Sequence, residues 1–144
     1  MNVLSKKIIS KYNYSKTKEY VEDELFTIKH LGTKLMCLLP PDAGRNISTS
    51  DRVDSNYSLG SKQERYVEKK DQLERELEKE KHKYNESFKL MTEDELIIFE
   101  EMFIYQLSDI DIEDKYGWSN TKINHLRKSF MIKFALSKGM YFEK

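Results

Sequence analysis

The chain has 144 residues, about the length of one domain. It carries 25 Lys and Arg residues and 25 Asp and Glu residues, so its formal net charge is zero, and 38% of its residues are hydrophobic. This balance argues against a disordered polyelectrolyte, and five Gly and two Pro residues are too few for the turns of an all-β sandwich or barrel. The longest apolar run, Leu35 to Leu39, is far shorter than the roughly 20 residues that cross a bilayer.

The charges are segregated along the chain. Residues 1–18 hold five Lys and no acid, residues 92–116 hold nine acids and only Lys115, and residues 119–138 hold five basic residues and no acid. Such alternation indicates separate surfaces with separate tasks. Cys37 is the only cysteine, so the chain has no intrachain disulfide. With no apolar signal region after the first lysines, we expect a cytoplasmic protein with no membrane association.

The N-terminal part predicts a loosely ordered basic segment followed by a helix. Residues 1–14 are polar and lack a sustained apolar period. Ser15 is a candidate cap for a helix that runs to about Leu39, where Pro40 and Pro41 stop it. Its apolar residues recur every three or four positions, which is typical of one helical face: Val21, Leu25, Ile28, Leu31, Leu35 and Leu38.

A long loop and a second helix follow. Residues 40–62 are rich in Ser, Asp and Gly, which predicts a loop, whereas residues 63–89 hold no Gly or Pro and predict a helix. The apolar stripe of this helix can pack antiparallel on the Val21 to Leu38 face. Homodimerisation through the same region is the open alternative.

Three helices are predicted in the C-terminal third. Thr92 and Glu95 form a capping box before the first helix, Ser108 can cap a short second helix, and Gly117 suits the left-handed conformation that ends it. Ser119 then caps a third helix that runs to about Ser137 and carries only basic charges. A helix, a tight Gly turn, a Ser cap and a basic helix together are typical of a helix-turn-helix.

This third resembles two related families. The segment Leu107-Ser-Asp-Ile-Asp-Ile-Glu-Asp-Lys-Tyr-Gly-Trp-Ser-Asn-Thr-Lys-Ile123 is similar to region 4 of bacterial sigma factors. The following run, from Leu126 to Gly139, more particularly resembles phage late-gene regulators of the ArpU and RinA type. The resemblance implies a small protein, acting in the host bacterial cytoplasm, that binds promoter or operator DNA and activates transcription by host RNA polymerase.

The predicted recognition helix divides into two sets of DNA-binding residues. Its first turns would enter the major groove of double-stranded DNA, and its later residues would contact the backbone or extend the readout. The first set is Ser119, Asn120, Thr121, Lys122 and Asn124, and the second is His125, Arg127, Lys128 and Lys133. The acidic segment 93–114 would then face away from DNA, toward RNA polymerase.

No catalytic or cofactor chemistry is indicated. His30, His82 and His125 form no metal-ligand spacing with each other or with Cys37, and the chain has no Gly-rich phosphate loop and no nucleophile elbow. We therefore expect a protein that is not an enzyme and that needs no metal or cofactor.

The sequence thus predicts an all-α protein with two long helices joined by a long loop and a C-terminal three-helix helix-turn-helix unit. The expected regions are residues 1–14, a helical hairpin or coiled-coil-like region over 15–91, and a DNA-binding domain over 92–144. Two other functions remain open, namely a phage small terminase-like DNA-packaging subunit and an RNA-polymerase-binding module that binds no DNA.

Overall fold

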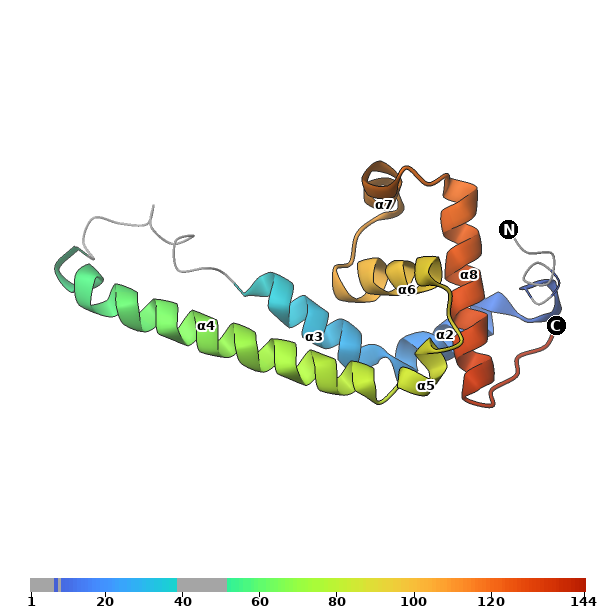
Figure 1. Cartoon of the computed structure of the whole chain (residues 1–144), viewed down its shortest axis with the longest axis horizontal. Helices are drawn as coiled ribbons and strands as arrows, with labels where there is room; N and C mark the ends of the chain where they lie inside the picture. Colours follow the sequence, from blue (N-terminus) through green and yellow to red (C-terminus); the bar gives the residue numbers. More distant parts are fainter. Residues whose placement is uncertain (1–6, 8, 39–51) are drawn as a thin grey trace.

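The computed structural model describes residues 7, 9–38 and 52–144, with only the backbone of residues 52–61. Within these ranges the regular secondary structure is helical (Figure 1), which confirms the predicted all-α class. The helices are α2 Tyr14–Glu24, α3 Phe26–Cys37, α4 Arg52–His82, α5 Asn85–Phe88, α6 Glu93–Phe99, the π-helix η3 Glu100–Ile104, α7 Asp109–Tyr116 and α8 Asn120–Ser137.

The N-terminal helical segment is divided into α2 and α3 at Leu25. The single helix predicted from Ser15 to about Leu39 is therefore wrong. Asn13, rather than Ser15, caps the segment, because its side chain accepts a hydrogen bond from the Lys16 amide at 3.1 Å. At Leu25 the backbone leaves the helical conformation, with φ −94° and ψ 12°. This break lets α2 pack on α8 while α3 packs on α4 and η3.

Helix α4 begins earlier and ends earlier than the helix predicted over residues 63–89. Its backbone is helical from Arg52 to His82, so residues 52–62 do not belong to a loop as predicted. This stretch contains no Pro, so every residue in it can donate its helical backbone hydrogen bond. Residues 40–51 of the predicted loop lie outside the described residues.

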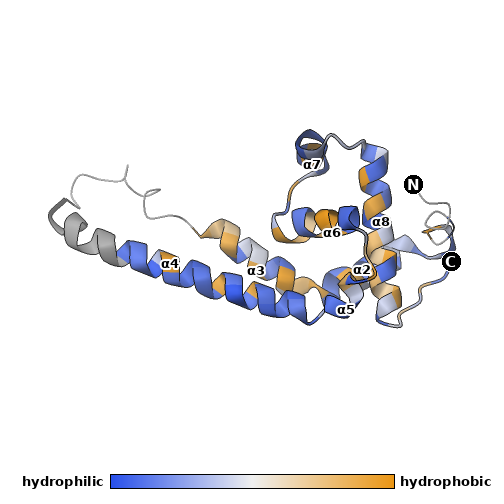
Figure 2. Ribbon diagram, viewed as in Figure 1, coloured by the Kyte–Doolittle hydropathy of each residue, from blue (hydrophilic) through white to orange (hydrophobic). Residues whose placement is uncertain are grey.

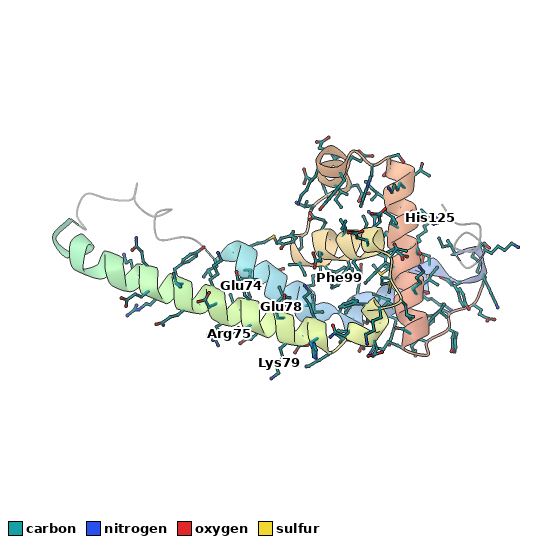
Figure 3. All side chains as sticks on the ribbon, viewed as in Figure 1. Glu74, Arg75, Glu78, Lys79, Phe99 and His125 are labelled. Atoms are coloured by element: carbon teal, nitrogen blue, oxygen red, sulfur yellow. The ribbon has the colours of Figure 1, made fainter. Side chains whose placement is uncertain are left out.

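The helices α3 and α4 run side by side in opposite directions (Figure 1), as the antiparallel packing prediction required. Leu73 and Leu77 are both 7% exposed and join α4 to the same apolar cluster as Ile28 and Leu31 of α3. Apart from these two leucines, the described side chains of α4 are mostly hydrophilic (Figure 2). Arg75, for example, lies on the side of α4 away from α3 (Figure 3).

The predicted helix caps of the C-terminal third are confirmed. The Thr92 hydroxyl accepts a hydrogen bond from the Glu95 amide at 3.2 Å, and the Glu95 carboxylate accepts one from the Thr92 amide at 2.8 Å. Ser108 and Ser119 cap α7 and α8 through their hydroxyls. Gly117 ends α7 in the left-handed conformation, with φ 70°.

One apolar core joins most of the helices. It takes buried residues from α2, α3, α4, α6, η3 and α8, so it crosses the predicted boundary between residues 91 and 92. Its centre is aromatic: the rings of Phe99 and Phe130 are stacked with their centroids 5.2 Å apart. A smaller cluster lies between α6, α7 and α8 and consists of Ile98, Ile112, Ile123 and Leu126.

Candidate nucleic-acid interface

The start of α8 is fixed by the turn that precedes it. The Ser119 hydroxyl accepts a hydrogen bond from the Lys122 amide at 3.2 Å, which fixes where the helix begins. Trp118 stacks on Tyr116, with ring centroids 4.8 Å apart, and both rings pack against the small cluster between α6, α7 and α8. The cap and the packed rings therefore fix the position of the first turn of α8.

One face of α8 remains accessible in its first half. Asn120, Thr121 and Lys128 are exposed, whereas Asn124 and His125 are half-buried. These five positions recur with helical spacing and share one side of the helix. Beyond Lys128 the helix is covered on nearly all sides, because its residues from Ser129 to Ala135 are buried except for Lys133. The structure thus brings together five of the nine predicted DNA-binding side chains, besides the cap residue Ser119.

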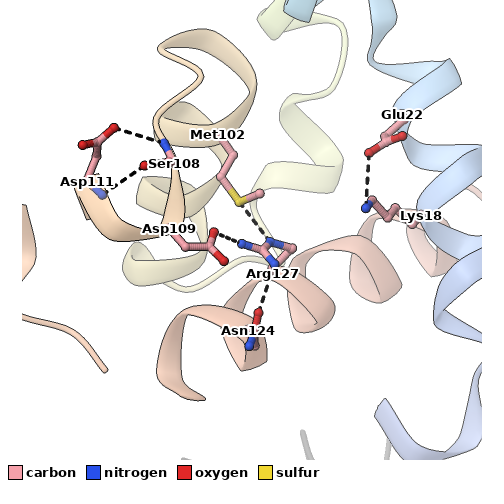
Figure 4. A network of polar contacts seen from close by, with 8 residues as sticks. All are labelled: Lys18, Glu22, Met102, Ser108, Asp109, Asp111, Asn124 and Arg127. Atoms are coloured by element: carbon pink, nitrogen blue, oxygen red, sulfur yellow. Dashed lines mark hydrogen bonds and ion pairs between the residues drawn. The ribbon is translucent and has the colours of Figure 1, made fainter. Parts of the chain in front are cut away.

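Arg127 does not lie on this face. Its side chain is 17% exposed and is held from three sides (Figure 4). It donates hydrogen bonds to Asn124 Oδ1 at 3.0 Å, to Met102 Sδ at 3.3 Å and to the Asp109 carboxylate. Arg127 therefore ties the first turn of α7 and the π-helix η3 to α8.

Lys133 is also engaged inside the protein. Its ammonium group donates to Glu95 Oε1 at 2.8 Å, and Glu95 is 2% exposed. The other Glu95 oxygen accepts a hydrogen bond from the buried Ser129 hydroxyl. Burial raises the pKa of Glu95, but the hydrogen bonds from Lys133, Ser129 and the Thr92 amide outweigh it, and the pKa lies below its ordinary value.

Lys122 is neither as exposed as Lys128 nor as enclosed within the protein as Arg127 and Lys133. Its ammonium group is 3.4 Å from an Asp94 carboxylate oxygen and 4.6 Å from the centre of the Trp118 ring. Both side chains of the ion pair remain partly exposed, at 37% and 45%, so the pair contributes little to stability.

The prediction of separate acidic and basic surfaces is therefore wrong for this part of the chain. Three basic residues of α8 each pair with a carboxylate from the acidic segment 92–116. The pairs are Lys122 with Asp94, Arg127 with Asp109 and Lys133 with Glu95. Much of the positive charge that the sequence assigns to α8 is neutralised by its neighbours in the fold.

The two ends of the described chain lie beside the accessible face of α8, which sequence reasoning missed. Tyr12 pairs with Glu143 in an isolated antiparallel bridge, and the Lys144 amide donates to the Lys11 carbonyl at 3.2 Å. These contacts involve residues 9–14 of the predicted N-terminal segment 1–14, whereas residues 1–6 and 8 lie outside the described residues. A contact between residues more than 130 positions apart leaves no periodic signal in the sequence.

A pocket of about 230 Å³ lies between these ends and α8. His125, which is labelled on α8 in Figure 3, and Lys128 line it from α8. The ammonium group of Lys128 lies 5.5 Å from the centre of the Tyr14 ring. Its lining residues are Ile9, Ser10, Tyr12, Tyr14, His125, Lys128 and Lys144.

Comparison with known proteins gives no match to a family model, to a curated protein or to a solved structure. Within the described ranges, no helix combines the length and apolar character needed to cross a membrane. The same ranges hold no group of three or more His, Cys, Asp or Glu residues placed to bind a metal ion.

Proposed function

We propose that this protein is a sequence-specific DNA-binding transcription regulator that places the first turns of α8 in the major groove. The observation that carries the proposal is the pair α7 and α8 with its tight turn. The turn is closed by Gly117 in the left-handed conformation and by the Ser119 cap, and it leaves a polar helix face exposed. This arrangement suits a recognition helix whose N-terminal residues contact base edges.

Within this proposal, base contacts come from Asn120, Thr121 and Asn124. The first two are exposed, and the Asn124 amide is oriented by its bond from Arg127. An oriented Asn amide is suited to bidentate pairing with adenine. Arg127 and Lys133 then position α8 rather than contact phosphates, because their charged groups are bound to Asp109 and Glu95.

The biological role we propose is activation of phage late genes together with host RNA polymerase. It follows from the resemblance of residues 107–139 to sigma region 4 and to late-gene regulators of the ArpU and RinA type. Exposed carboxylates such as those of Glu93 and Asp114 are available for a polymerase contact. The proposed fold is that family's arrangement of a helical N-terminal part and a C-terminal helix-turn-helix.

The test is selection of bound duplexes from a random-sequence library, followed by binding isotherms on the selected duplex and a scrambled one. We expect Asn120→Ala and Thr121→Ala each to cost roughly 1–3 kcal/mol on the selected duplex and little on the scrambled one. Thr27→Ala, an exposed substitution on α3, is the matched control and should change neither isotherm.

Other outcomes favour the two alternatives. Binding to RNA polymerase without any enrichment of DNA would indicate an RNA-polymerase-binding module. A ring of many subunits in solution would indicate a small terminase-like packaging subunit. A monomer or a dimer that enriches one DNA sequence supports the proposed regulator.

A further inference from the structure

Residues 9–14 and 142–144 lie together against α8, and we call them the terminal clasp. The clasp is held by the Tyr12 and Glu143 bridge and by the bond from the Lys144 amide to the Lys11 carbonyl. The ring of Phe142 also contacts Tyr20 of α2, with centroids 5.9 Å apart. These contacts fix the clasp next to the accessible face of α8 rather than leaving its lysines on a free tail.

The pocket between the clasp and α8 is lined by two lysines and by no acidic side chain. Lys128 and Lys144 contribute ammonium groups and His125 an imidazole, and the lining residues include no Asp or Glu side chain. Lys11 lies on the same clasp, and its nearest acid is Glu143 at 3.9 Å. Both partners of that pair are more than half exposed, so it is a weak restraint on the lysine.

The basic residues of α8 itself do not provide such a surface. Arg127 and Lys133 are bound to carboxylates inside the protein, and Lys122 forms a partly exposed ion pair with Asp94, so Lys128 is the exposed lysine on the accessible face. A helix that enters the major groove is flanked by phosphates, and cations that contact them supply a large share of the binding free energy.

We propose that the terminal clasp is the phosphate-binding surface of the protein. Lys144 of the clasp and Lys128 of α8 contact backbone phosphates of the same duplex that the first turns of α8 read. This inference rests on the proposed DNA-binding function and adds to it a second element, contributed by residues 9–14 and 142–144. The clasp supplies affinity and orientation, whereas Asn120 and Thr121 supply sequence discrimination.

The experiment compares Lys128→Ala, Lys144→Ala and the matched control Lys138→Ala by isotherms at several salt concentrations. Lys138 is an exposed lysine just past the other end of α8, over the Tyr84 ring at 4.8 Å. We expect the first two variants to weaken binding to the selected and scrambled duplexes equally. Each should reduce the salt slope by about 0.9, so that the affinity loss is about eight-fold larger at about 0.1 M than at about 1 M salt.

One further variant and the wild type complete the design. Lys144→Arg keeps the charge and should keep the wild-type slope, and Lys138→Ala should bind as the wild type does. A wild-type slope for Lys144→Ala would overturn the inference, whatever the slope for Lys128→Ala, while leaving the proposed function standing. Equal wild-type binding to all sequences, weakened by these two variants, would support the clasp and overturn sequence-specific readout. Failure of the wild type to bind any duplex would overturn both.

Discussion

Glu95 is a buried carboxylate that ties the start of α6 to the middle of α8. It accepts hydrogen bonds from the Thr92 amide at 2.8 Å, from Lys133 at 2.8 Å and from the Ser129 hydroxyl. A buried charge is tolerated only when its partners satisfy it, and loss of one partner leaves the other uncompensated. Glu95 therefore stabilises the packing of α8 against α6, so its role is structural.

Glu95→Gln should lower the free energy of unfolding by about 2–4 kcal/mol at neutral pH, since it leaves the Lys133 ammonium group without its charged partner. The pKa of Glu95 is lowered in the folded state, so its ionised form contributes stability above the ordinary carboxyl pKa of about 4.3. That contribution is lost as pH falls through the folded pKa. Urea unfolding between pH 7 and pH 2 should show the wild type and variant converging on acidification. A pH-independent difference would contradict this assignment.

Gly32 of α3 lies directly against the backbone of Ile104 in η3. A Cβ atom at this position would lie 2.5 Å from the Ile104 carbonyl oxygen and 2.9 Å from its Cα. Gly32→Ala should therefore force the two helices apart and destabilise the protein by about 1–3 kcal/mol, although alanine favours helix more than glycine does. Thermal unfolding measures the effect, with Thr27→Ala on the same helix as control. If Gly32→Ala were more stable than the wild type, α3 and η3 would be able to move apart at little cost in free energy.

At the scale of elements, the turn between α7 and α8 decides how the candidate recognition helix is presented. Gly117 supplies the left-handed backbone, Ser119 the cap, and Trp118 the packing between them. Trp118 is half-buried and stacks on Tyr116. Its ring is thus partly exposed and packs against the edge of the small cluster.

Trp118→Ala should cost about 1.5–3 kcal/mol of stability, less than the 3–5 kcal/mol typical of a fully buried aromatic ring. Trp118→Phe, which keeps an aromatic ring against Tyr116, should cost less than the alanine variant. Chemical denaturation followed by circular dichroism gives both values. A loss of DNA binding in Trp118→Ala with unchanged stability would instead identify the ring as a surface contact.

At the scale of the molecule, the shared core predicts cooperative unfolding across the boundary at residues 91 and 92. Leu25 is fully buried in the same cluster as Phe130 and Phe134 of α8. Leu25→Ala should destabilise the protein by about 2–5 kcal/mol. In this variant, the thermal unfolding transition reported by Trp118, the only tryptophan, should shift to lower temperature together with the unfolding transition measured by circular dichroism. An unshifted Trp118 transition would mean that the C-terminal third unfolds as an independent domain.

The sequence by itself determined the features that depend on neighbouring residues. The all-α class follows from apolar periodicity and from the scarcity of Gly and Pro. The capping box at Thr92, the caps at Ser108 and Ser119 and the left-handed Gly117 were all predictable, because each is satisfied within a few residues of the chain. The position at which the candidate recognition helix begins follows from the same local rules.

Only the tertiary structure decided how those elements use their charges. The sequence showed α8 as uniformly basic, but the fold brings Asp94, Glu95 and Asp109 against it. It also brings residues 9–14 and 142–144 together beside Lys128, and it breaks the first helix at Leu25 so that α2 can reach α8. These contacts join residues far apart in the chain. Their energies depend on packing between elements, and no propensity of a short segment encodes them.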